Sequence, residues 1–345
     1  MTVKALVRAT SHPRHFLGLA AAALTAAVVL SACSSSGGNG SGDPQTPLTP
    51  VGSGASSQSG GASGSGAPST SASTSAKPQA PRKPVHVSLF QGDGQTYGVG
   101  MAIVAQFSKH APTSAHAFDK AVTVKVNGSP VKGAWFWVKS NTGYLMEAQY
   151  RMQNYWPAHS KIEMNMPLKG LDAGPGLEFD DSLTLSLNIG AAHISKVDGS
   201  NERMVVTADG RPLKTLLVSL GKATTPTYLG TKVVMEKKNP QLMVSAPGES
   251  NPYSLKVPWS VRVTLDGEFV HSASWNGGNI GSRSTSHGCT NLNTGDAQWF
   301  YNFSRIGDVV TYANTQTNNV MPSWDGFGWW NVPWTEWVQG NLLKN

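Results

Sequence analysis

Short runs of alternating apolar and polar residues recur every ten to fifteen positions between Val85 and Asn188. β-Branched and aromatic residues dominate these runs, and turn signals such as Gly92-Asp93-Gly94 and Asn127-Gly128 separate them. The runs are VHVSLF, GVGMAIVAQF, AVTVKVNG, GAWFWVK, YLMEAQYR, KIEMNMPL and SLTLSLNIG. About seven alternating strands favour a mostly β chain in which residues 85–190 form an immunoglobulin-like β-sandwich.

Residues 191–313 contain a second strand-rich pattern. Ala208-Asp209-Gly210-Arg211 predicts a hairpin, and Asp266-Gly267 predicts a tight turn that makes Glu268 to Ser274 a strand. Thr294 to Arg305 has a capping residue, an acidic first turn and regularly spaced apolar positions, so it is the expected main helix. Periodicity alone therefore predicts a mostly β domain with one helix.

The N-terminal residues have the pattern of an export signal. Three basic residues precede the apolar run from Phe16 to Leu30, which is too short and too rich in alanine for a stable membrane span. The run ends in Leu30-Ser31-Ala32-Cys33, which resembles the bacterial lipobox. We therefore expect a lipoprotein signal peptide at residues 1–32 and a lipid on Cys33 that anchors the chain to the outer face of the cell membrane. An ordinary signal peptidase site near Ala32 is the alternative.

The segment that follows has a composition unsuited to a folded core. From Ser34 to about Pro84 it consists almost entirely of Ser, Gly, Ala, Thr, Pro and Gln. Such a chain cannot bury enough apolar surface to offset its ordering entropy, so residues 33–84 are expected to form a disordered tether. Cys33 and Cys289 are the only two cysteines. Lipidation of the first leaves the second as the only thiol of an exported protein, which suits a reactive residue.

The charge balance indicates the surroundings only in general terms. A formal net charge of +7 and a pI near 9.3 suit anionic surroundings such as a bacterial wall or a membrane surface. Charged residues are only 14% of the chain, so the charge alone selects no partner. No run of Lys or Arg alternates with aromatic residues, and nucleic acid is therefore not an expected partner.

The chemically informative stretch runs from His271 to Asn291, HSASWNGGNIGSRSTSHGCTN. A thiol attacks a carbonyl as the thiolate, so Cys289 needs a base within hydrogen-bond reach, and a histidine brought back by a loop supplies one. The strand pattern places His271 at or near a strand end and Cys289 at the end of the following loop. Gly288 allows a tight turn, so the backbone amides of His287, Gly288 and Cys289 could converge as an oxyanion hole. The stretch predicts a cysteine-nucleophile active site.

The motif also carries a family resemblance. His271, fourteen intervening residues and then SHGCTN resemble the signature of the L,D-transpeptidases, the peptidoglycan cross-linking enzymes with a YkuD-type catalytic domain. The flanking segments FVHSASW and GDAQWFY fit the same pattern, and YRMQNYWPAHS (150–160) resembles a corner of the immunoglobulin-like domain of actinobacterial members. The resemblance implies a YkuD β-sandwich-like fold for residues 191–313. It also implies that the tryptophan-rich extension 314–345 packs on the folded domains.

The resemblance implies a reaction for the two central residues. Cys289 attacks the carbonyl of the third residue of a tetrapeptide donor stem, expels the terminal D-alanine and forms a thioester. An amine of an acceptor stem then resolves the thioester as a 3-3 cross-link. His271 takes the thiol proton, and the backbone carbonyl of Ser272 orients this histidine. A carbonyl in place of a carboxylate agrees with the absence of Asp and Glu near the motif.

The resemblance also implies supporting residues. Ser286 and Asn291 hold the loop by hydrogen bonds, His287 shapes it, and the hydroxyl of Tyr253 faces the thioester oxygen. The residues expected to contact substrate are Met235, Tyr253, Trp275 and Asn291; for the first three, packing in the core is the alternative. No dissociable cofactor and no metal is implied. Carbapenem-type β-lactams are expected to acylate the same thiol as mimics of the substrate.

Three other functions stay open at this point. His271, His287 and Cys289 could bind zinc, although the spacing offers no fourth ligand. An L,D-carboxypeptidase or hydrolase would use the same acyl-enzyme with water as acceptor, and the motif does not separate the two, because cleft shape and water exclusion select the acceptor. A lipid-anchored wall-binding module without turnover is the third, and the intact Cys, His and Asn set disfavours it.

Overall fold

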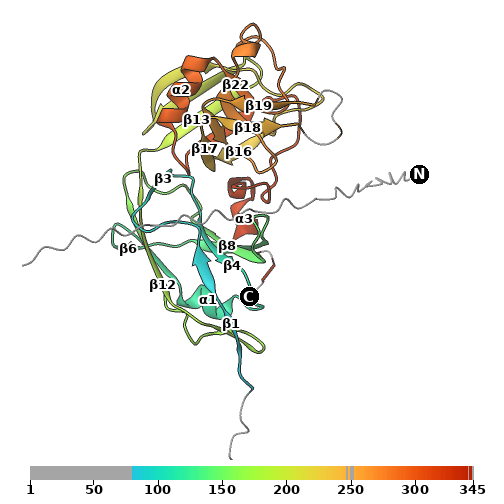
Figure 1. Cartoon of the computed structure of the whole chain (residues 1–345). Helices are drawn as coiled ribbons and strands as arrows, with labels where there is room; N and C mark the ends of the chain where they lie inside the picture. The colour runs from blue at the N-terminus through green and yellow to red at the C-terminus, as the bar shows by residue number, and fades with distance from the viewer. Residues whose placement is uncertain (1–79, 246–247, 249–251, 341, 344–345) are drawn as a thin grey trace, which may run out of the picture. The chain divides into compact units, whose positions relative to one another are not determined.

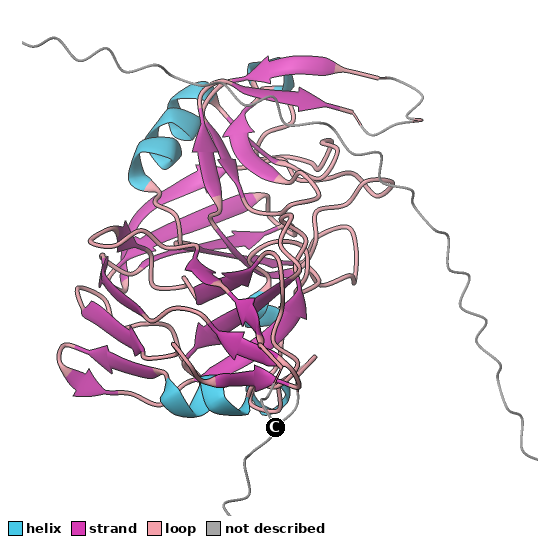
Figure 2. Cartoon of the chain, turned by 60° about the horizontal axis from the view of Figure 1, so that its bottom comes forward, coloured by secondary structure: helices cyan, strands magenta, loops and turns pink. Residues whose placement is uncertain are grey.

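Figure 1 shows the computed structural model, which describes residues 80–245, 248, 252–340 and 342–343. The expected signal peptide (1–32), the expected lipidation residue Cys33 and the expected tether as far as residue 79 lie outside the described residues. Strands make up most of the regular structure (Figure 2), which confirms the prediction of a mostly β chain. Within the described ranges, no helix is long and apolar enough to cross a membrane.

The first domain is built from two main sheets and one small sheet. One main sheet has the order β2-β4-β8-β7, formed by β2 (Val87–Leu89), β4 (Ile103–Phe107), β8 (Met146–Arg151) and β7 (Ala134–Lys139). The other has the order β3-β12-β9-β5-β6, formed by β3 (Thr96–Tyr97), β12 (Leu183–Ile189), β9 (Lys161–Met166), β5 (Thr123–Val126) and β6 (Ser129–Pro130). The small sheet joins β1 (Lys83–Val85), β11 (Leu177–Phe179) and β10 (Asp172–Gly174). Each of the segments predicted as strands contains one.

This domain also contains a helix that the strand pattern did not predict, α1 (His116–Ala121). Its Phe118 is fully buried, and the ring lies 5.0 Å from the rings of both Trp135 and Trp137. Six residues are fewer than two helical turns, so no helical period is visible in the sequence. The packing of one phenylalanine ring against two tryptophans thus holds a short helix inside a region expected to be entirely β.

The second domain consists of two sheets, a hairpin and one long helix. The five-stranded sheet has the order β15-β14-β13-β23-β16, formed by β15 (Arg211–Leu217), β14 (Arg203–Ala208), β13 (His193–Asp198), β23 (Val309–Ala313) and β16 (Gly230–Val233). The four-stranded sheet has the order β17-β20-β21-β22, formed by β17 (Glu236–Lys238), β20 (Ser260–Arg262), β21 (Phe269–Ser272) and β22 (Thr290–Leu292). The hairpin pairs β18 (Gln241–Val244) with β19 (Ser254–Val257).

The long helix α2 (Thr294–Phe303) begins where the sequence predicts it and ends two residues earlier than expected. Ser304 is extended, with ψ of 148°, and its Oγ donates to the Phe300 carbonyl over 2.7 Å, which closes the helix. Ala297 and Phe300 of α2 are buried in one cluster with residues of β21 and β22. The helix therefore supports the two strands that flank the loop from His271 to Asn291.

The C-terminal residues pack on both domains. They form the short helices η2 (Trp329–Asn331) and α3 (Trp334–Trp337). The Nε1 atoms of Trp329 and Trp330 both donate to the Gly100 carbonyl of the first domain, over 2.8 and 2.7 Å. In the second domain, the Thr231 amide donates to Asn331 Oδ1 over 2.7 Å. The extension thus bonds to both sides of the domain junction.

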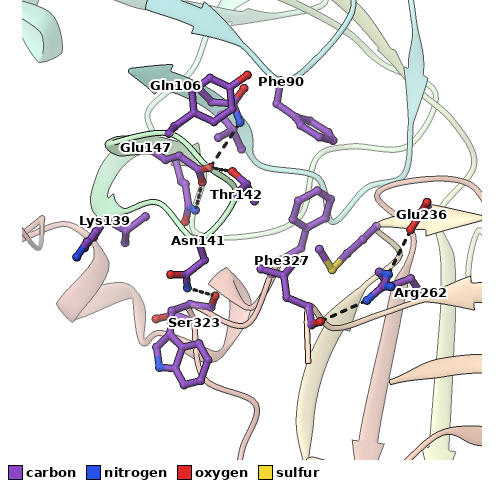
Figure 3. Close-up of a pocket in the computed structure, with 18 of the residues that line it drawn as sticks. Phe90, Gln106, Lys139, Asn141, Thr142, Glu147, Glu236, Arg262, Ser323 and Phe327 are labelled. Carbon is purple, nitrogen blue, oxygen red and sulfur yellow. Dashed lines mark hydrogen bonds and ion pairs between the residues drawn. The ribbon is translucent and has the colours of Figure 1, made fainter. Parts of the chain in front are cut away.

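A cavity of about 660 Å³ lies where residues of the two domains and the extension meet (Figure 3). Glu147 lies in its wall and accepts hydrogen bonds from Ser140 and Thr142, over 2.9 and 2.7 Å. Across the cavity, Arg262 forms an ion pair with Glu236 at 3.2 Å. This cavity shares no lining residue with the pocket around Cys289 that is described below.

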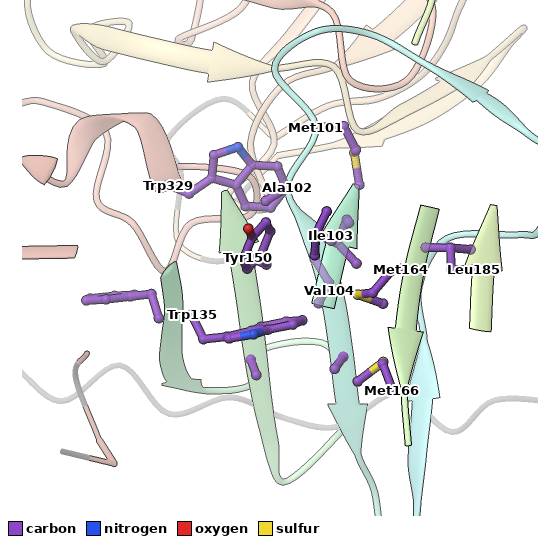
Figure 4. Packing of buried hydrophobic residues seen from close by; sticks show 14 of the residues in the cluster. Met101, Ala102, Ile103, Val104, Trp135, Tyr150, Met164, Met166, Leu185 and Trp329 are labelled. Carbon is purple, nitrogen blue, oxygen red and sulfur yellow. The ribbon is translucent and has the colours of Figure 1, made fainter. Parts of the chain in front are cut away.

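The core of the first domain shows the expected period of two. Along β9, Ile162, Met164 and Met166 are buried while the residues between them are not. Met164 lies opposite Leu185 of β12 in the antiparallel register, and Figure 4 shows both among the inward-facing side chains. Alternation places side chains of one strand on opposite faces, so one face of this sheet closes the core.

Arg151 and Trp337 form the central contact between the extension and the first domain. The Arg151 guanidinium lies over the Trp337 ring at 4.3 Å and over the Trp330 ring at 4.6 Å. Trp337 is fully buried, stacks on Phe136 with ring centroids 4.6 Å apart, and donates its Nε1–H to the Ala134 carbonyl. One indole therefore combines apolar burial, a hydrogen bond and a cation–π contact.

We predict that Trp337→Ala lowers the free energy of unfolding by about 3–5 kcal/mol, because it leaves a cavity and removes these contacts. Trp324→Ala is the matched control: Trp324 is 55% exposed, so its loss should change that free energy by about 0.5 kcal/mol or less. Chemical denaturation followed by circular dichroism measures both variants. Equal destabilisation by the two substitutions would contradict the packing described above.

Candidate active site

Two neighbouring parallel strands bring the residues of the motif together. β21 pairs with β22 so that His271 lies opposite Asn291 and Ser272 opposite Leu292. Cys289 immediately precedes β22 and lies two residues before Asn291, so these two side chains leave the strand on the same side. Parallel neighbours need a crossover connection, and residues 273–289 provide it. The register of one strand pair therefore places the thiol, the imidazole and the amide on one face.

Hydrogen bonds between polar side chains hold the crossover loop. Asn276 Nδ2 donates to Ser219 Oγ over 3.2 Å, and Thr285 Oγ1 donates to Asn276 Oδ1 over 3.0 Å. Ser219 Oγ donates to the Arg283 carbonyl over 2.8 Å. The backbones of Ser219 and Asn291 also pair with each other, at 2.9 and 3.1 Å. These bonds tie the loop to the segment that follows β15, which pairs with β22 through the isolated bridge between Ser219 and Asn291.

Gly288 has a φ of +114°, a conformation that other residues adopt only with strain. Its N–H donates to Ser286 Oγ over 3.1 Å, and its carbonyl accepts from Thr227 Oγ1 at 2.8 Å. Ser286 Oγ donates in turn to the Cys289 carbonyl over 2.6 Å. The expectation that the Gly288 amide serves an oxyanion is therefore corrected, because the Ser286 hydroxyl occupies it. The backbone amides of His287 and Cys289 remain the expected donors.

His271 is held as a neutral base. Its Nδ1 lies 2.8 Å from the Ser272 carbonyl, and since a carbonyl only accepts, Nδ1 carries the hydrogen and Nε2 keeps its lone pair. Burial lowers the pKa of His271 to about 4. The imidazole also stacks on Trp275, with ring centroids 6.0 Å apart. The backbone carbonyl of Ser272 thus lies in the orienting position that the family resemblance implies for it.

Cys289 is held as a neutral thiol. Its Sγ donates to the Gly267 carbonyl at 3.6 Å, and burial raises the pKa of the thiol to about 12. Within the described residues, no hydrogen bond joins Sγ to His271. Both residues line the same pocket. Since the thiol faces a carbonyl, attack on a substrate requires Sγ to leave Gly267.

The pocket around the thiol has a volume of about 500 Å³. Of the residues predicted from the sequence, it is lined by Tyr253, His271, Trp275, Ser286, His287, Cys289 and Asn291. Trp275 has 59% of its surface exposed to solvent. Asn291 Oδ1 is buried and has no hydrogen-bond partner among the described residues. A buried amide oxygen without a protein partner is a ready acceptor for a ligand N–H.

Met235 does not lie in this pocket. It lines the cavity at the domain junction, where a Cβ on Gly326 would lie 2.5 Å from its Sδ. The expectation that Met235 contacts substrate beside Cys289 is therefore corrected. Met235 lies between β16 and β17, and the next residue, Glu236, lines the same cavity, so this segment of backbone runs along the domain junction.

The absence of acidic residues near the motif holds for the sequence of the loop but not for the folded site. Glu268 is buried directly behind the loop and forms an ion pair with Lys232, which is fully buried. The sequence reasoning missed both residues. A charged residue among the apolar positions of GTKVVM is the signal that could have indicated the pair, because lysine is almost never fully buried without a partner.

The side chains present also bear on the zinc hypothesis. Among the residues that the structure describes, no three or more His, Cys, Asp or Glu side chains gather as a potential metal site. His271 directs its Nδ1–H to a carbonyl and Cys289 directs its thiol to another. Nδ1 of His271 and Sγ of Cys289 are thus each engaged by a backbone carbonyl.

Comparisons with known proteins agree with this site. Residues 192–311 match the family model of the L,D-transpeptidase catalytic domain, YkuD, and residues 49–172 match that of a bacterial Ig domain. The chain is 31% identical over 266 residues to L,D-transpeptidase 2 of Mycobacterium tuberculosis, an alignment that covers 75% of this chain and 63% of that protein. It is 30% identical over 249 residues to probable L,D-transpeptidase 3 of the same species, covering 65% of this chain and 84% of that protein. The chain thus spans less than two thirds of the first relative.

Solved structures show the same architecture. An L,D-transpeptidase in complex with imipenem superposes with a TM-score of 0.56 at 26% identity, covering 68% of this chain and 100% of that chain. L,D-transpeptidase 3 of Mycobacterium tuberculosis, in complex with a faropenem-derived adduct, gives a TM-score of 0.53 at 27% identity. This match covers 66% of this chain and 97% of that chain. The predicted order of an immunoglobulin-like domain and a YkuD-type domain is confirmed. With its Cys289 and His271 inside the matched catalytic domain, the chain belongs to the L,D-transpeptidase family.

Proposed function

We propose that this protein is a peptidoglycan L,D-transpeptidase that forms 3-3 cross-links between stem peptides through a thioester on Cys289. The observation that carries the proposal is the placing of Cys289, His271 and Asn291 on one face of two parallel strands, at the wall of one pocket. The similarity to L,D-transpeptidase 2 and to probable L,D-transpeptidase 3 supports the same class of acyl transfer. The pocket supplies a nucleophile, a base and an unpartnered amide oxygen for it.

In the first half-reaction, Cys289 Sγ attacks the carbonyl carbon of the third residue of a tetrapeptide donor. His271 Nε2 accepts the thiol proton as the C–S bond forms, so neither a free thiolate nor a free imidazolium is required beforehand. Backbone amides of the loop stabilise the oxyanion. The bond to D-alanine then breaks, and the amine of D-alanine leaves with the proton that His271 held.

In the second half-reaction, the amine of an acceptor stem attacks the thioester carbonyl. His271 Nε2 accepts a proton from this amine, the C–S bond breaks, and the sulfur leaves as the thiol after taking the proton back. The new amide is the 3-3 cross-link. Since Nδ1–H stays bonded to the Ser272 carbonyl, the same ring nitrogen serves both steps.

Side chains around the pocket suit a peptide substrate. Asn291 Oδ1 can accept a hydrogen bond from an amide N–H of the stem, and the exposed Trp275 offers an apolar surface at the pocket wall. We assign the hydroxyl of Tyr253 to the thioester oxygen, because Tyr253 lies in the wall with its ring 5.6 Å from that of His287. One structural relative was solved in complex with imipenem and another with a faropenem-derived adduct, which supports covalent β-lactam binding here.

Residues 1–33 support a further part of the proposal, which concerns location. A basic start, an apolar run and Leu-Ser-Ala-Cys form a lipoprotein signal, so the mature chain would begin at a lipidated Cys33 on the outer face of the cell membrane. Peptidoglycan lies outside this membrane. The proposed location therefore places the pocket in the same compartment as its substrate.

Incubation of the protein with a tetrapeptide donor stem and excess acceptor stem, followed by mass spectrometry, tests the reaction. We predict a 3-3 dimer with loss of one D-alanine and an acyl adduct on Cys289. Cys289→Ala should give neither product. His271→Gln should retain the thiol but acylate about 10²- to 10⁴-fold more slowly, because it removes the base.

Circular dichroism of both variants controls for folding. Only trimmed tripeptide, without dimer, would show that water is the acceptor and would identify a carboxypeptidase or hydrolase. Unchanged product in Cys289→Ala would exclude the thioester mechanism. Wall binding by Cys289→Ala together with an inert parent protein would favour the non-catalytic module.

The two shifted pKa values predict an unusual dependence on pH. The reactive form contains neutral His271 and neutral Cys289, and it predominates between a histidine pKa of about 4 and a thiol pKa of about 12. The rate of acylation by a carbapenem should therefore change less than about twofold between pH 5.5 and 9. Below this range the rate falls as His271 takes up a proton.

Stopped-flow or mass-resolved acylation at several pH values measures this profile. If the acylation rate instead fell to half its maximum near pH 6.5, the ordinary histidine pKa, the pKa of His271 would be normal in the reacting complex. That result would contradict the neutral pair. The Asn291→Ala variant is a useful control, since it should lower the rate without changing the shape of the profile.

A further inference from the structure

A buried ion pair lies directly behind the nucleophile. Lys232 on β16 is fully buried, and Glu268, in the turn between β20 and β21, is 7% exposed. Nζ of the lysine bonds to Oε2 of the glutamate. The Tyr228 amide donates to the other carboxylate oxygen over 2.8 Å, and Nζ lies 3.9 Å from the Tyr312 ring centroid. The pair is therefore satisfied on both sides, and it joins the five-stranded sheet to the four-stranded sheet.

Three consecutive residues at the end of the crossover loop, Gly288 to Thr290, contact this ion pair or residues next to it. A Cβ on Gly288 would lie 3.6 Å from Glu268 Cγ, so the carboxylate side chain lies against that glycine. Cys289 Sγ donates to the carbonyl of Gly267, the residue before the glutamate. Thr290 Oγ1 and Tyr312 Oη are hydrogen-bonded at 2.8 Å, and Tyr312 is the ring under the lysine.

Stability alone does not explain such a pair. Removing two charges from water has a large cost, and replacing a buried ion pair by apolar residues of similar volume is often neutral or stabilising. Burial by itself raises the pKa of Glu268 and lowers the pKa of Lys232, and the attraction between the two opposes both shifts. The contacts with Gly288 and Gly267 point to a role at the thiol.

We propose that Lys232 and Glu268 are positioning residues for Cys289, whose ion pair fixes the Gly267 carbonyl and the Gly288 loop and keeps the charge behind Sγ balanced. The lysine provides a positive charge near a developing thiolate, and the glutamate cancels it while Sγ is protonated. This inference rests on the proposed function only in taking Cys289 as the nucleophile.

Other ionisable groups face this cluster and belong to the same electrostatic environment. The charge of Asp325 raises the pKa of Lys232, and that of Asp266 raises the pKa of Glu268. The charge of Arg262 lowers the pKa of the Cys289 thiol. Burial is the largest influence on the thiol, and the two members of the pair act on it with opposite signs: the glutamate raises its pKa and the lysine lowers it. Removing one member should therefore shift thiol reactivity in the direction set by the charge that remains.

Alkylation of the thiol by iodoacetamide at pH 7.5 tests the proposal without any stem peptide. Glu268→Gln keeps the side-chain shape and leaves the lysine charge unbalanced, so the alkylation rate should rise about tenfold, which corresponds to a thiol pKa about one unit lower. Lys232→Met should lower the rate or leave it unchanged. The double variant is again balanced and should return to within about threefold of the parent rate.

Asp296→Asn is the matched control, because it breaks the partly exposed Lys214–Asp296 pair in the same domain and should leave the rate unchanged. Circular dichroism checks folding, and Lys232→Gln replaces the methionine variant if that variant does not fold. A folded Glu268→Gln variant with an unchanged or lower rate overturns the proposal. So does a rise in both single variants, since that result indicates a loosened loop.

The outcome is independent of the reaction assigned above. If the parent protein fails to cross-link stems but the two single variants alkylate in opposite directions, the proposed function fails and the positioning role stands. If cross-linking occurs and Glu268→Gln alkylates like the parent, the positioning role fails alone.

Discussion

Parallel pairing of β21 with β22 is the constraint on which the active site depends. The register sets His271 beside Asn291, and the period of two sets Cys289 on the same side as Asn291. A parallel pair cannot be closed by a tight turn, so a long crossover loop is unavoidable. The chain uses that loop twice: its start provides Trp275 at the pocket wall, and its end provides the strained Gly288 that precedes the nucleophile.

Burial determines the protonation states of this site. Burial of Cys289 and His271 away from water disfavours the charged form of each, so the thiol stays protonated and the imidazole stays neutral. A site of this kind differs from a preformed thiolate–imidazolium pair, in which the nucleophile is charged before substrate arrives. Negative charge develops on Sγ here only during attack, when a substrate carbonyl is in place. Such an arrangement protects the only free cysteine of the described chain from unselective chemistry.

Much of the site could be predicted from the sequence because its central residues are close together in the chain. The Asp266-Gly267 turn fixed the start of β21, and the spacing from His271 to Cys289 fixed the length of the loop. Lys232 was not predictable in the same way, because it comes from another sheet and meets Glu268 only through the tertiary fold. Helix α1 escaped prediction since it is too short to show a period.

The misplacement of Met235 and the partner of Gly288 show a different limit. Met235 lies between β16 and β17, and neither Val234 nor Glu236 beside it lines the pocket around Cys289, so the path of the backbone and not the phase of a strand sets its position. The backbone conformation at Gly288 points its amide hydrogen at the Ser286 hydroxyl, and no residue pattern encodes that direction. Motifs therefore identify which residues gather at a site, while the atoms that face one another follow from packing.

Strand β23 connects the domain junction to the thiol. At its start, a Cβ on Gly100 of the first domain would lie 2.6 Å from Val309 Cγ2, so the Val309 side chain packs against the Gly100 backbone in space that only glycine leaves open. At its other end, Tyr312 bonds to Thr290, the residue after the nucleophile, and its ring lies under Lys232. Because β23 also pairs with β13 and β16, its position is fixed on both sides. The contact with the immunoglobulin-like domain and the support of Cys289 are thus made by opposite ends of one five-residue strand.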